Sequence, residues 1–276
     1  MRCVTLIGFC FLLLNAGQAQ AGLFSSKKEG KTAEQLYEDC SRNFQRGYYT
    51  KALEICNRVR NLFRDNPVSI LAELSVADIY YKRGDFEQSR IAYEDFSRLH
   101  PRHQKMDYVS YRIGLSIYKR APRLAGRDQT STRQAVNAWA AFDSRFPNSE
   151  HLVEVDKLSM KARNRLAMKE RHVAKFYAGR KAWGATQQRL EGLLMRYGNT
   201  PTAPRATAML GIAYHQWGMS QQALAMKDRM EKDFPDSKYR STLNKALSKP
   251  AGEKPEESIF VRPYRTPGGA APQTAG

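Results

Sequence analysis

The sequence predicts an all-α fold, a solenoid of about five helical hairpins. Pro67 and Pro101 lie 34 residues apart, and the interval from a turn glycine to the next proline is 17 residues both at Gly84–Pro101 and at Gly218–Pro235. Small and aromatic residues occupy corresponding places between these markers. A fixed period of this length is typical of stacked repeats, in which each hairpin covers the apolar face of its neighbour. A generic helical bundle with incidental spacing is the alternative, and the repeated equal intervals argue against it.

The final hairpin shows the residue pattern of a tetratricopeptide repeat (TPR), whose period is about 34 residues. Its marks are Leu210, Gly211, Tyr214, Gly218, Ala223, Phe234 and Pro235. The second hairpin has Ala77, Tyr80, Gly84, Ser89, Tyr93, Phe96 and Pro101 in corresponding places. The third contains a longer connection between its helices, at about Lys119 to Thr132. The predicted hairpins span residues 33–67, 68–101, 105–147, 152–201 and 203–248.

The amino terminus predicts export. The apolar stretch Cys3–Leu14 and the small-x-small site Ala19-Gln20-Ala21 are typical of a secretory signal peptide, here residues 1–21. A lipoprotein signal needs a small residue before its cysteine, whereas Phe9 precedes Cys10. We therefore expect ordinary cleavage without a lipid anchor.

The ends of the mature chain differ in composition from the repeats. Residues 22–32 are expected to form a flexible leader. Residues 249–276 are rich in Pro, Gly, Ala and charged residues, so a disordered tail is predicted there. After the signal peptide, no segment has the roughly 20 apolar residues of a membrane helix.

The chain is basic, with a formal net charge of +18 that is unevenly distributed. The window Arg98–Arg133 holds nine basic and two acidic residues, and the window Lys157–Arg189 holds ten basic residues against Glu170 alone. A basic surface suits nucleic acid, anionic lipid or an acidic protein. The predicted export argues against nucleic acid, and an ordinary solvated surface is the remaining alternative.

Cys40 and Cys56 are the two cysteines that remain after the predicted cleavage. They stand equally far on either side of Tyr48, at the predicted turn of the first hairpin, so antiparallel helices bring them level. The secreted compartment permits a disulfide. The sequence leaves two alternatives for this pair: a disulfide that links the two helices of the hairpin, or two buried thiols.

Short motifs recur in a characteristic order from Asp107 onward. They are Asp107-Tyr108-Val109 with Tyr111 and Gly114, Gly126-Arg127-Asp128, Phe146-Pro147-Asn148-Ser149, Arg165-Leu166-Ala167 with Glu170, Val173-Ala174 with Tyr177, Ala182-Trp183, and Arg189-Leu190-Glu191-Gly192-Leu193-Leu194. In their order and spacing these motifs resemble the BamD (ComL/YfiO) family of the outer-membrane β-barrel assembly machinery. The similarity covers roughly residues 33–247. The basic charge, the proline-rich tail and the missing lipobox depart from the family's pattern.

The resemblance implies a TPR component that is peripheral on the periplasmic, inner face of the outer membrane. Its first three repeats are implied to recognise the carboxy-terminal targeting segments of unfolded outer-membrane proteins. Its last two are implied to dock on the periplasmic domains of BamA, the barrel-forming subunit. Arg189 corresponds to the family arginine that meets an acidic residue on BamA, and an ordinary exposed arginine is the alternative. Arg127 and Asp128 are expected to shape the connection of the third repeat.

In a TPR array, the first helix of each hairpin lines the concave face. This register selects Tyr37, Phe44, Leu74, Tyr81, Tyr108, Tyr111 and Tyr118 as candidate lining residues of a peptide groove. Aromatic rings suit an extended peptide because they bury a large area at low entropic cost. The nearby cations Arg112, Lys119, Arg120 and Arg123 are candidates for the terminal carboxylate of that peptide. Packing of the tyrosines between hairpins is the alternative.

The sequence offers no catalytic pattern. Five histidines, His100, His103, His151, His172 and His215, are scattered without metal-ligand spacing, and the chain lacks a nucleophile elbow and a phosphate-binding glycine loop. We expect no enzyme activity, cofactor or metal. Two other functions stay open: a different periplasmic TPR scaffold, such as a pilus or cell-envelope coordinator, and a protein that binds lipopolysaccharide or anionic lipid through its basic windows.

Overall fold

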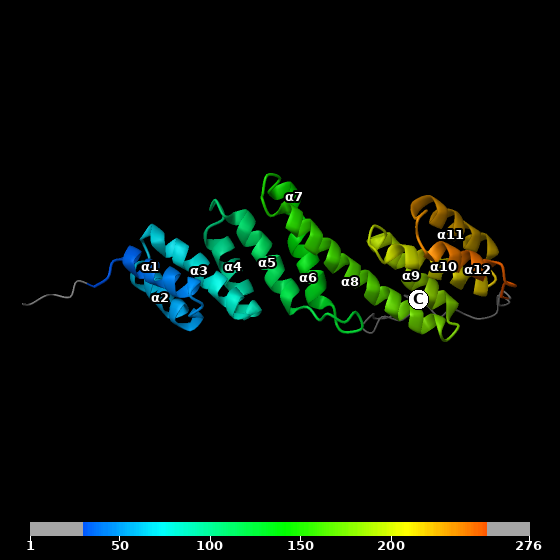
Figure 1. Cartoon of the computed structure of the whole chain (residues 1–276), viewed down its shortest axis with the longest axis horizontal. Coiled ribbons are helices and arrows are strands. Elements are labelled where there is room, and N and C mark those ends of the chain that lie inside the picture. Colours follow the sequence, from blue (N-terminus) through cyan, green and yellow to red (C-terminus); the bar gives the residue numbers. More distant parts are fainter. Residues whose placement is uncertain (1–29, 253–276) are drawn as a thin grey trace, which may run out of the picture.

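Twelve α-helices follow one another along the long axis of the molecule in the computed structural model, which describes residues 30–252 (Figure 1). Their bounds are α1 (Ala33–Gln45), α2 (Tyr49–Leu62), α3 (Pro67–Arg83), α4 (Phe86–Leu99), α5 (Met106–Arg120), α6 (Thr130–Trp139), α7 (Phe142–Arg145), α8 (Leu152–Ala178), α9 (Trp183–Tyr197), α10 (Ala203–Gln216), α11 (Ser220–Asp233) and α12 (Tyr239–Leu247). The predicted signal peptide, most of the leader and most of the tail lie outside the described residues. All regular structure of residues 30–252 is helical, so the all-α prediction is confirmed.

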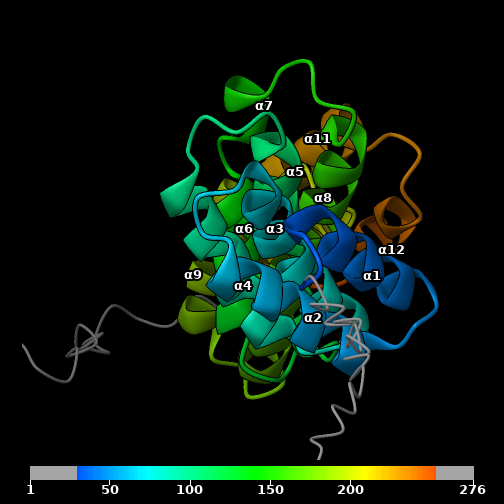
Figure 2. The ribbon, with the colours of Figure 1, turned by 90° about the vertical axis from the view of Figure 1, so that its left-hand side faces the viewer.

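Consecutive helices pack as hairpins. Helix α1 packs on α2, α3 on α4, α5 on α6, α8 on α9 and α10 on α11, and the hairpins contact each other through α2–α3, α4–α5, α6–α8 and α9–α10. Figure 2 looks along this stack from the α1–α2 end. Contacts between sequential neighbours define a TPR-like solenoid, and this predicted fold class is confirmed. The last unit is more than a hairpin, because a third helix, α12, packs on α10 and α11.

Local sequence sets where helices begin and end. Thr32 and Gln35 form a capping box at the start of α1, and the Asn66 side chain caps α3 by accepting from the Val68 N–H at 2.8 Å. Gly84 ends α3 with φ at 90°, a left-handed conformation that glycine adopts without steric cost. This residue is the turn glycine from which the 17-residue interval was counted.

Small residues lie where the two helices of a hairpin cross. In the second hairpin, the Ser89 hydroxyl donates to the Ala77 carbonyl at 3.1 Å. In the third, Gly114 faces Trp139 so closely that a Cβ at residue 114 would lie 2.2 Å from the indole Nε1. That indole N–H donates to the Tyr111 carbonyl at 3.2 Å. Both crossings therefore bring the helices closer than a larger side chain permits.

The long connection of the third hairpin, between α5 and α6, is held by its own polar side chains. The buried Gln129 amide donates to the Leu124 carbonyl at 2.9 Å and accepts from the Thr132 hydroxyl at 2.5 Å. Asp128 accepts from the backbone N–H and the hydroxyl of Thr130, at 3.2 and 3.0 Å. Asp128 thus contributes to the shape of the loop.

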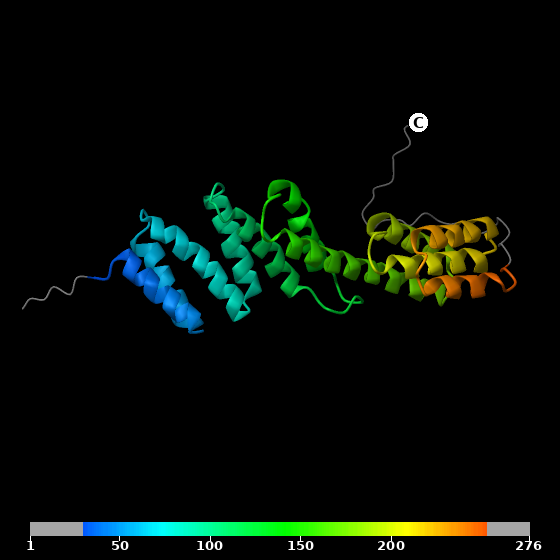
Figure 3. The same ribbon diagram turned by 45° about the horizontal axis from the view of Figure 1, so that its top comes forward.

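Helix α8 has 27 residues and links the two parts of the stack (Figure 3). Near its start, Val155 and Leu158 join the core formed with α5, α6 and α7. Further along, Ala167 and Ala174 join the core formed with α9, α10 and α11. Within residues 30–252, every helix falls short of the combined length and hydropathy that a membrane span needs.

Candidate functional site

Two neighbouring hollows open along α5, between α3 and α8. The first has a volume of about 390 Å³ and is lined by Tyr81, Tyr111, Leu115, Tyr118, Lys119, Ala121, Arg123, Glu154, Leu158 and Arg165. The second has a volume of about 590 Å³ and is lined by Leu74, Asp78, Gln104, Lys105, Asp107, Tyr108, Asn148, Glu150 and His151. These side chains come from α3, α5 and α8, the first helices of three successive hairpins, from the loops that precede α5 and α8, and from the loop that follows α5. We call the two hollows together the α5 groove.

The two hollows differ in charge. The first holds three cationic side chains and one carboxylate, whereas the second holds three carboxylates and one lysine. Tyr111 of the first hollow stacks on His151 of the second, with ring centroids 5.0 Å apart and 18° between the planes. This stacked pair marks the boundary between the hollows. The α5 groove therefore has a positive end and a negative end.

A polar network centred on Asp78 lies behind the groove wall. Asp78 accepts hydrogen bonds from the hydroxyls of Tyr93 and Tyr108, the latter at 2.5 Å. Arg112 lies 3.7 Å from the same carboxylate, donates to the Tyr93 hydroxyl at 2.9 Å, and places its guanidinium carbon 3.7 Å from the ring centroid of Tyr81. Burial raises the pKa of Tyr93 and of Tyr108, so both hydroxyls stay protonated at neutral pH. The network fixes Tyr81 and Tyr108, the two of these tyrosines that line the groove.

This network removes Arg112 from the cations that were expected to meet a terminal carboxylate. Its side chain is only 11% exposed and already has its acidic and aromatic partners. Arg120 forms an ion pair with Glu87 of α4. Lys119 and Arg123 line the first hollow. Two of the four expected cations therefore face the groove.

Five of the seven predicted groove residues line the α5 groove: Leu74, Tyr81, Tyr108, Tyr111 and Tyr118. Leu74 is 5% exposed and packs in the core with Phe96, so it forms the floor of the second hollow. Tyr37 and Phe44 pack against the core of the first hairpin, and the Tyr37 hydroxyl lies 3.2 Å from the Ser75 hydroxyl. The structure places these two α1 residues outside both hollows, because α1 uses them to pack against its own hairpin and α3.

Sequence reasoning missed Asp78, His151 and Arg165 as groove residues. Arg165 donates to the Tyr118 hydroxyl at 2.9 Å and places its guanidinium carbon 4.7 Å from the centroid of that ring. A signal for Asp78 was present, because an acid within the apolar stretch of α3 requires partners. The places of His151 and Arg165 depend on how α8 lies against α5, which local sequence does not specify.

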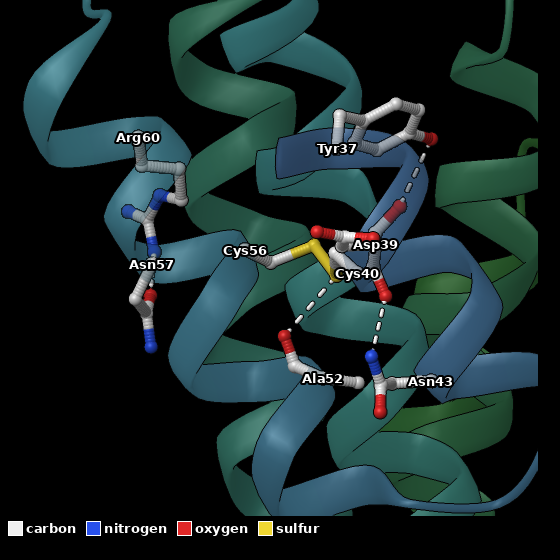
Figure 4. Close-up of a disulfide and its surroundings, with 9 residues drawn as sticks. Tyr37, Asp39, Cys40, Asn43, Ala52, Cys56, Asn57 and Arg60 are labelled. Carbon is white, nitrogen blue, oxygen red and sulfur yellow. Dashed lines mark hydrogen bonds between the residues drawn. A yellow bond between two sulfur atoms is a disulfide. The ribbon is translucent and has the colours of Figure 1, made fainter. Parts of the chain in front are cut away.

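The structure joins Cys40 of α1 and Cys56 of α2 in a disulfide (Figure 4). Both residues are fully buried in the core of the first hairpin. Cys40 Sγ also lies 3.1 Å from the Ala52 carbonyl oxygen. A disulfide sulfur carries no proton to donate, so this approach is close packing at the helix crossing. The sequence left open a disulfide or a pair of buried thiols, and the structure contains the disulfide.

Arg189 lies on α9, and its side chain is 47% exposed. One guanidinium nitrogen is 3.4 Å from a carboxylate oxygen of Glu170 on α8, and Arg196 approaches the other oxygen at 3.9 Å. Arg189 thus has a carboxylate partner within the chain and keeps exposed surface for a second one. Residues 30–252 contain no group of three or more His, Cys, Asp or Glu side chains suited to a metal ion.

Comparison with known protein families shows the family to which this chain belongs. The model of the YfiO family, described as outer membrane lipoprotein, matches residues 29–230. The chain belongs to the YfiO family. The resemblance carried by the motifs is thereby confirmed. That description names a lipoprotein, whereas Phe9 before Cys10 predicts no lipid anchor on this chain. Phe9 and Cys10 lie outside the described residues.

Relatives of this YfiO-family chain include proteins named outer membrane protein assembly factor BamD. The one from Neisseria meningitidis serogroup A is 29% identical and covers 75% of this chain and 81% of its own length. The one from Vibrio cholerae is 27% identical and covers 71% of this chain and 86% of its own length. Among solved structures, the TPR2AB domain of yeast Sti1 in its pHSP90 complex aligns with a TM-score of 0.39 at 15% identity, covering 78% of this chain and 84% of that chain.

Proposed function

We propose that this YfiO-family chain is a non-catalytic assembly factor for outer-membrane β-barrel proteins and works in the periplasm, at the inner face of the outer membrane. In this proposal, the α5 groove binds targeting segments of unfolded outer-membrane proteins. The α9 surface around Arg189 docks on the periplasmic domains of BamA. The observation that carries the proposal is a tyrosine-lined groove with opposite charges at its two ends, in a chain whose relatives are named assembly factors.

An extended peptide that ends in an aromatic residue fits the positive end of the groove. Its ring packs among Tyr81, Tyr111 and Tyr118, which offer large rigid surfaces. Burial raises the pKa of Tyr81 and of Tyr111, so their hydroxyls remain neutral donors. The terminal carboxylate meets Lys119 and Arg123 through charge-assisted hydrogen bonds. The carboxylates of the second hollow repel a carboxy terminus and thereby set the direction of the peptide.

The charge of the first hollow is tested by replacing Lys119 and Arg123 with glutamate. The measurement is fluorescence anisotropy with a peptide from the carboxy terminus of a β-barrel protein, as the free acid and as the amide. The wild type is expected to prefer the free acid by about ten-fold or more, because hydrogen bonds between charged groups contribute about 1.5–3 kcal/mol. The double variant loses this preference. A control with Arg46→Glu and Arg58→Glu, which changes the charge equally on the first hairpin, keeps it. Equal binding of both peptides by the wild type would contradict the proposal.

The surface around Arg189 suits an acidic partner. It belongs to the window with ten basic residues and one acid, so its field favours a negatively charged surface. Such complementarity raises the association rate and orients the encounter more than it adds raw affinity. Arg189 keeps exposed guanidinium surface beside Glu170, so a second carboxylate can approach it without breaking the internal pair.

Arg189→Glu is expected to abolish co-purification of BamA from envelopes that contain it. The substitution places two carboxylates side by side, Glu170 and the new glutamate, and turns the contact with an acidic partner into repulsion. Lys232→Glu on α11 is the matched control and is expected to retain BamA. Undiminished BamA capture by Arg189→Glu would rule out this contact. Capture of a pilus or other envelope protein in place of BamA by the wild type would favour a different scaffold function.

A further inference from the structure

Two basic windows that are separate in the sequence meet at one surface. The α5–α6 loop, residues 121–129, belongs to the first window and lies against α8, which carries the second (Figure 1, Figure 3). Arg165 of α8 donates to the Pro122 carbonyl at 3.3 Å. Gly126 lies over His172 of α8, whose Nε2 is 3.6 Å from the place of a Cβ at residue 126. The loop is therefore packed on the helix along several residues.

The loop–α8 surface consists of Leu124, Arg127, Lys169, His172, Phe176 and Arg180. The spacing of the last four puts them on one face of α8 and its C-terminal end. Leu124 is 69% exposed and Phe176 is 52% exposed, so two large apolar side chains face solvent. The Arg180 guanidinium carbon lies 3.5 Å from the Phe176 ring centroid. A cation therefore lies over the Phe176 ring, and Leu124 lies in the loop that carries Arg127.

Acidic groups do little to cancel this positive charge. Asp128 belongs to the loop, and its side-chain hydrogen bond with Thr130 lowers its pKa, so it carries a negative charge. Lys169 of α8 faces this carboxylate and lowers its pKa further. Glu170 is paired with two arginines of α9. The surface keeps a positive excess.

We propose that the loop–α8 surface binds the headgroup layer of a membrane that contains anionic phospholipid. Its cations attract the headgroups, and each basic residue near an anionic surface strengthens binding about five-fold. Leu124 and Phe176 enter the boundary between headgroups and acyl chains, as the apolar side chains of interfacial segments do. A lipid surface fits better than an acidic protein, because the cations are spread along a loop and a helix face around exposed apolar side chains. This binding requires neither a client peptide nor BamA.

Vesicle sedimentation tests the proposal with the full mature chain. We expect it to bind vesicles of phosphatidylethanolamine with phosphatidylglycerol, to leave phosphatidylcholine vesicles unbound, and to lose binding as salt rises. The triple variant Arg127→Gln, Lys169→Gln and Arg180→Gln is expected to bind roughly 100-fold more weakly, since three basic residues are neutralised.

The matched control removes the same charge from the first hairpin, through Arg46→Gln, Arg58→Gln and Arg64→Gln. It is expected to weaken binding only a few-fold, and circular dichroism checks that both triple variants are folded. Equal losses in the two triple variants would overturn the proposal, because binding would then follow net charge rather than this surface. Absence of vesicle binding by the wild type would overturn the proposal as well. That holds even if the loop–α8 surface is found to bind an acidic protein.

A label at residue 124 tests the apolar contact separately. The two cysteines of the repeats are joined in a disulfide, so an environment-sensitive dye on Leu124→Cys reports on the loop alone. A blue shift of its emission is expected with the phosphatidylglycerol vesicles and none with phosphatidylcholine. Bound protein without a blue shift would contradict insertion of the loop. The assay contains no peptide and no BamA, so its failure leaves the proposed assembly function standing, and failure of that function leaves this result standing.

Discussion

Asp78→Ala is expected to lower the free energy of unfolding by about 3 kcal/mol or more. The carboxylate accepts from two tyrosine hydroxyls and lies 3.7 Å from Arg112, so its removal leaves a buried guanidinium without its acidic partner. Breaking a buried ion pair from one side costs about 3–5 kcal/mol, and the part-exposed setting of Asp78 favours the lower end of that range. Urea unfolding followed by circular dichroism measures the change.

Asp95→Ala provides the matched control. Asp95 pairs with Arg98 at 2.7 Å, but both side chains are exposed, so the loss is expected to stay within about 1 kcal/mol. If the two variants lost equal stability, Asp78 would have no special role in holding α3, α4 and α5 together. Peptide binding by folded Asp78→Ala is also expected to weaken, because Tyr108 loses its hydrogen-bond acceptor and Arg112, which lies over the Tyr81 ring, loses its acidic partner.

Removal of the Cys40–Cys56 disulfide is expected to destabilise the first hairpin by about 3 kcal/mol. The bond closes a loop with a sequence separation of 16, and a loop of about that length gives this magnitude on the chain-entropy estimate. The effect should be local, since a terminal repeat has a neighbour on one side only. Thermal unfolding with and without reductant, together with hydrogen exchange of α1 and α2, measures it.

The double variant Cys40→Ala and Cys56→Ala is the control for reductant. It should resemble the reduced wild type and show no further response to reductant. Mass measurement before and after reduction should differ by two hydrogen atoms in the wild type. An unchanged mass, or equal stability of the oxidised and reduced wild type, would show that the bond does not form in solution or does not stabilise the hairpin.

The fold was predictable from the sequence because each repeat contains the residues that set its own turn and helix crossing. The turn glycines Gly47, Gly84 and Gly218 all have positive φ, at 80°, 90° and 73°. The fourth hairpin has Lys181 at its turn, also with a positive φ, at 57°. Small residues at the helix crossings and prolines after the second helices complete the pattern. Each of these residues acts on nearby backbone, so the pattern can be recognised from the sequence alone. The third helix of the last unit escaped this reasoning, because α12 follows the pattern's final proline.

The site was predictable only in part. The helix register placed Tyr81, Tyr111 and Tyr118 in one groove, and the structure brings all three to the first hollow. The same register could not show which cations already have an acidic partner within the chain. Arg112 is taken up by Asp78 and Arg120 by Glu87, and both of these contacts cross between hairpins.

The sequence by itself determined the repeat architecture, the family and the helices that supply the groove, since periodicity and motif order are properties of the chain taken locally. Only the tertiary structure decided which charges remain available and which separate segments share a surface. The two basic windows look independent along the chain, yet packing of the α5–α6 loop on α8 joins them. The physical reason is that the availability of a side chain depends on neighbours from distant parts of the sequence, and their identity follows from how successive hairpins stack.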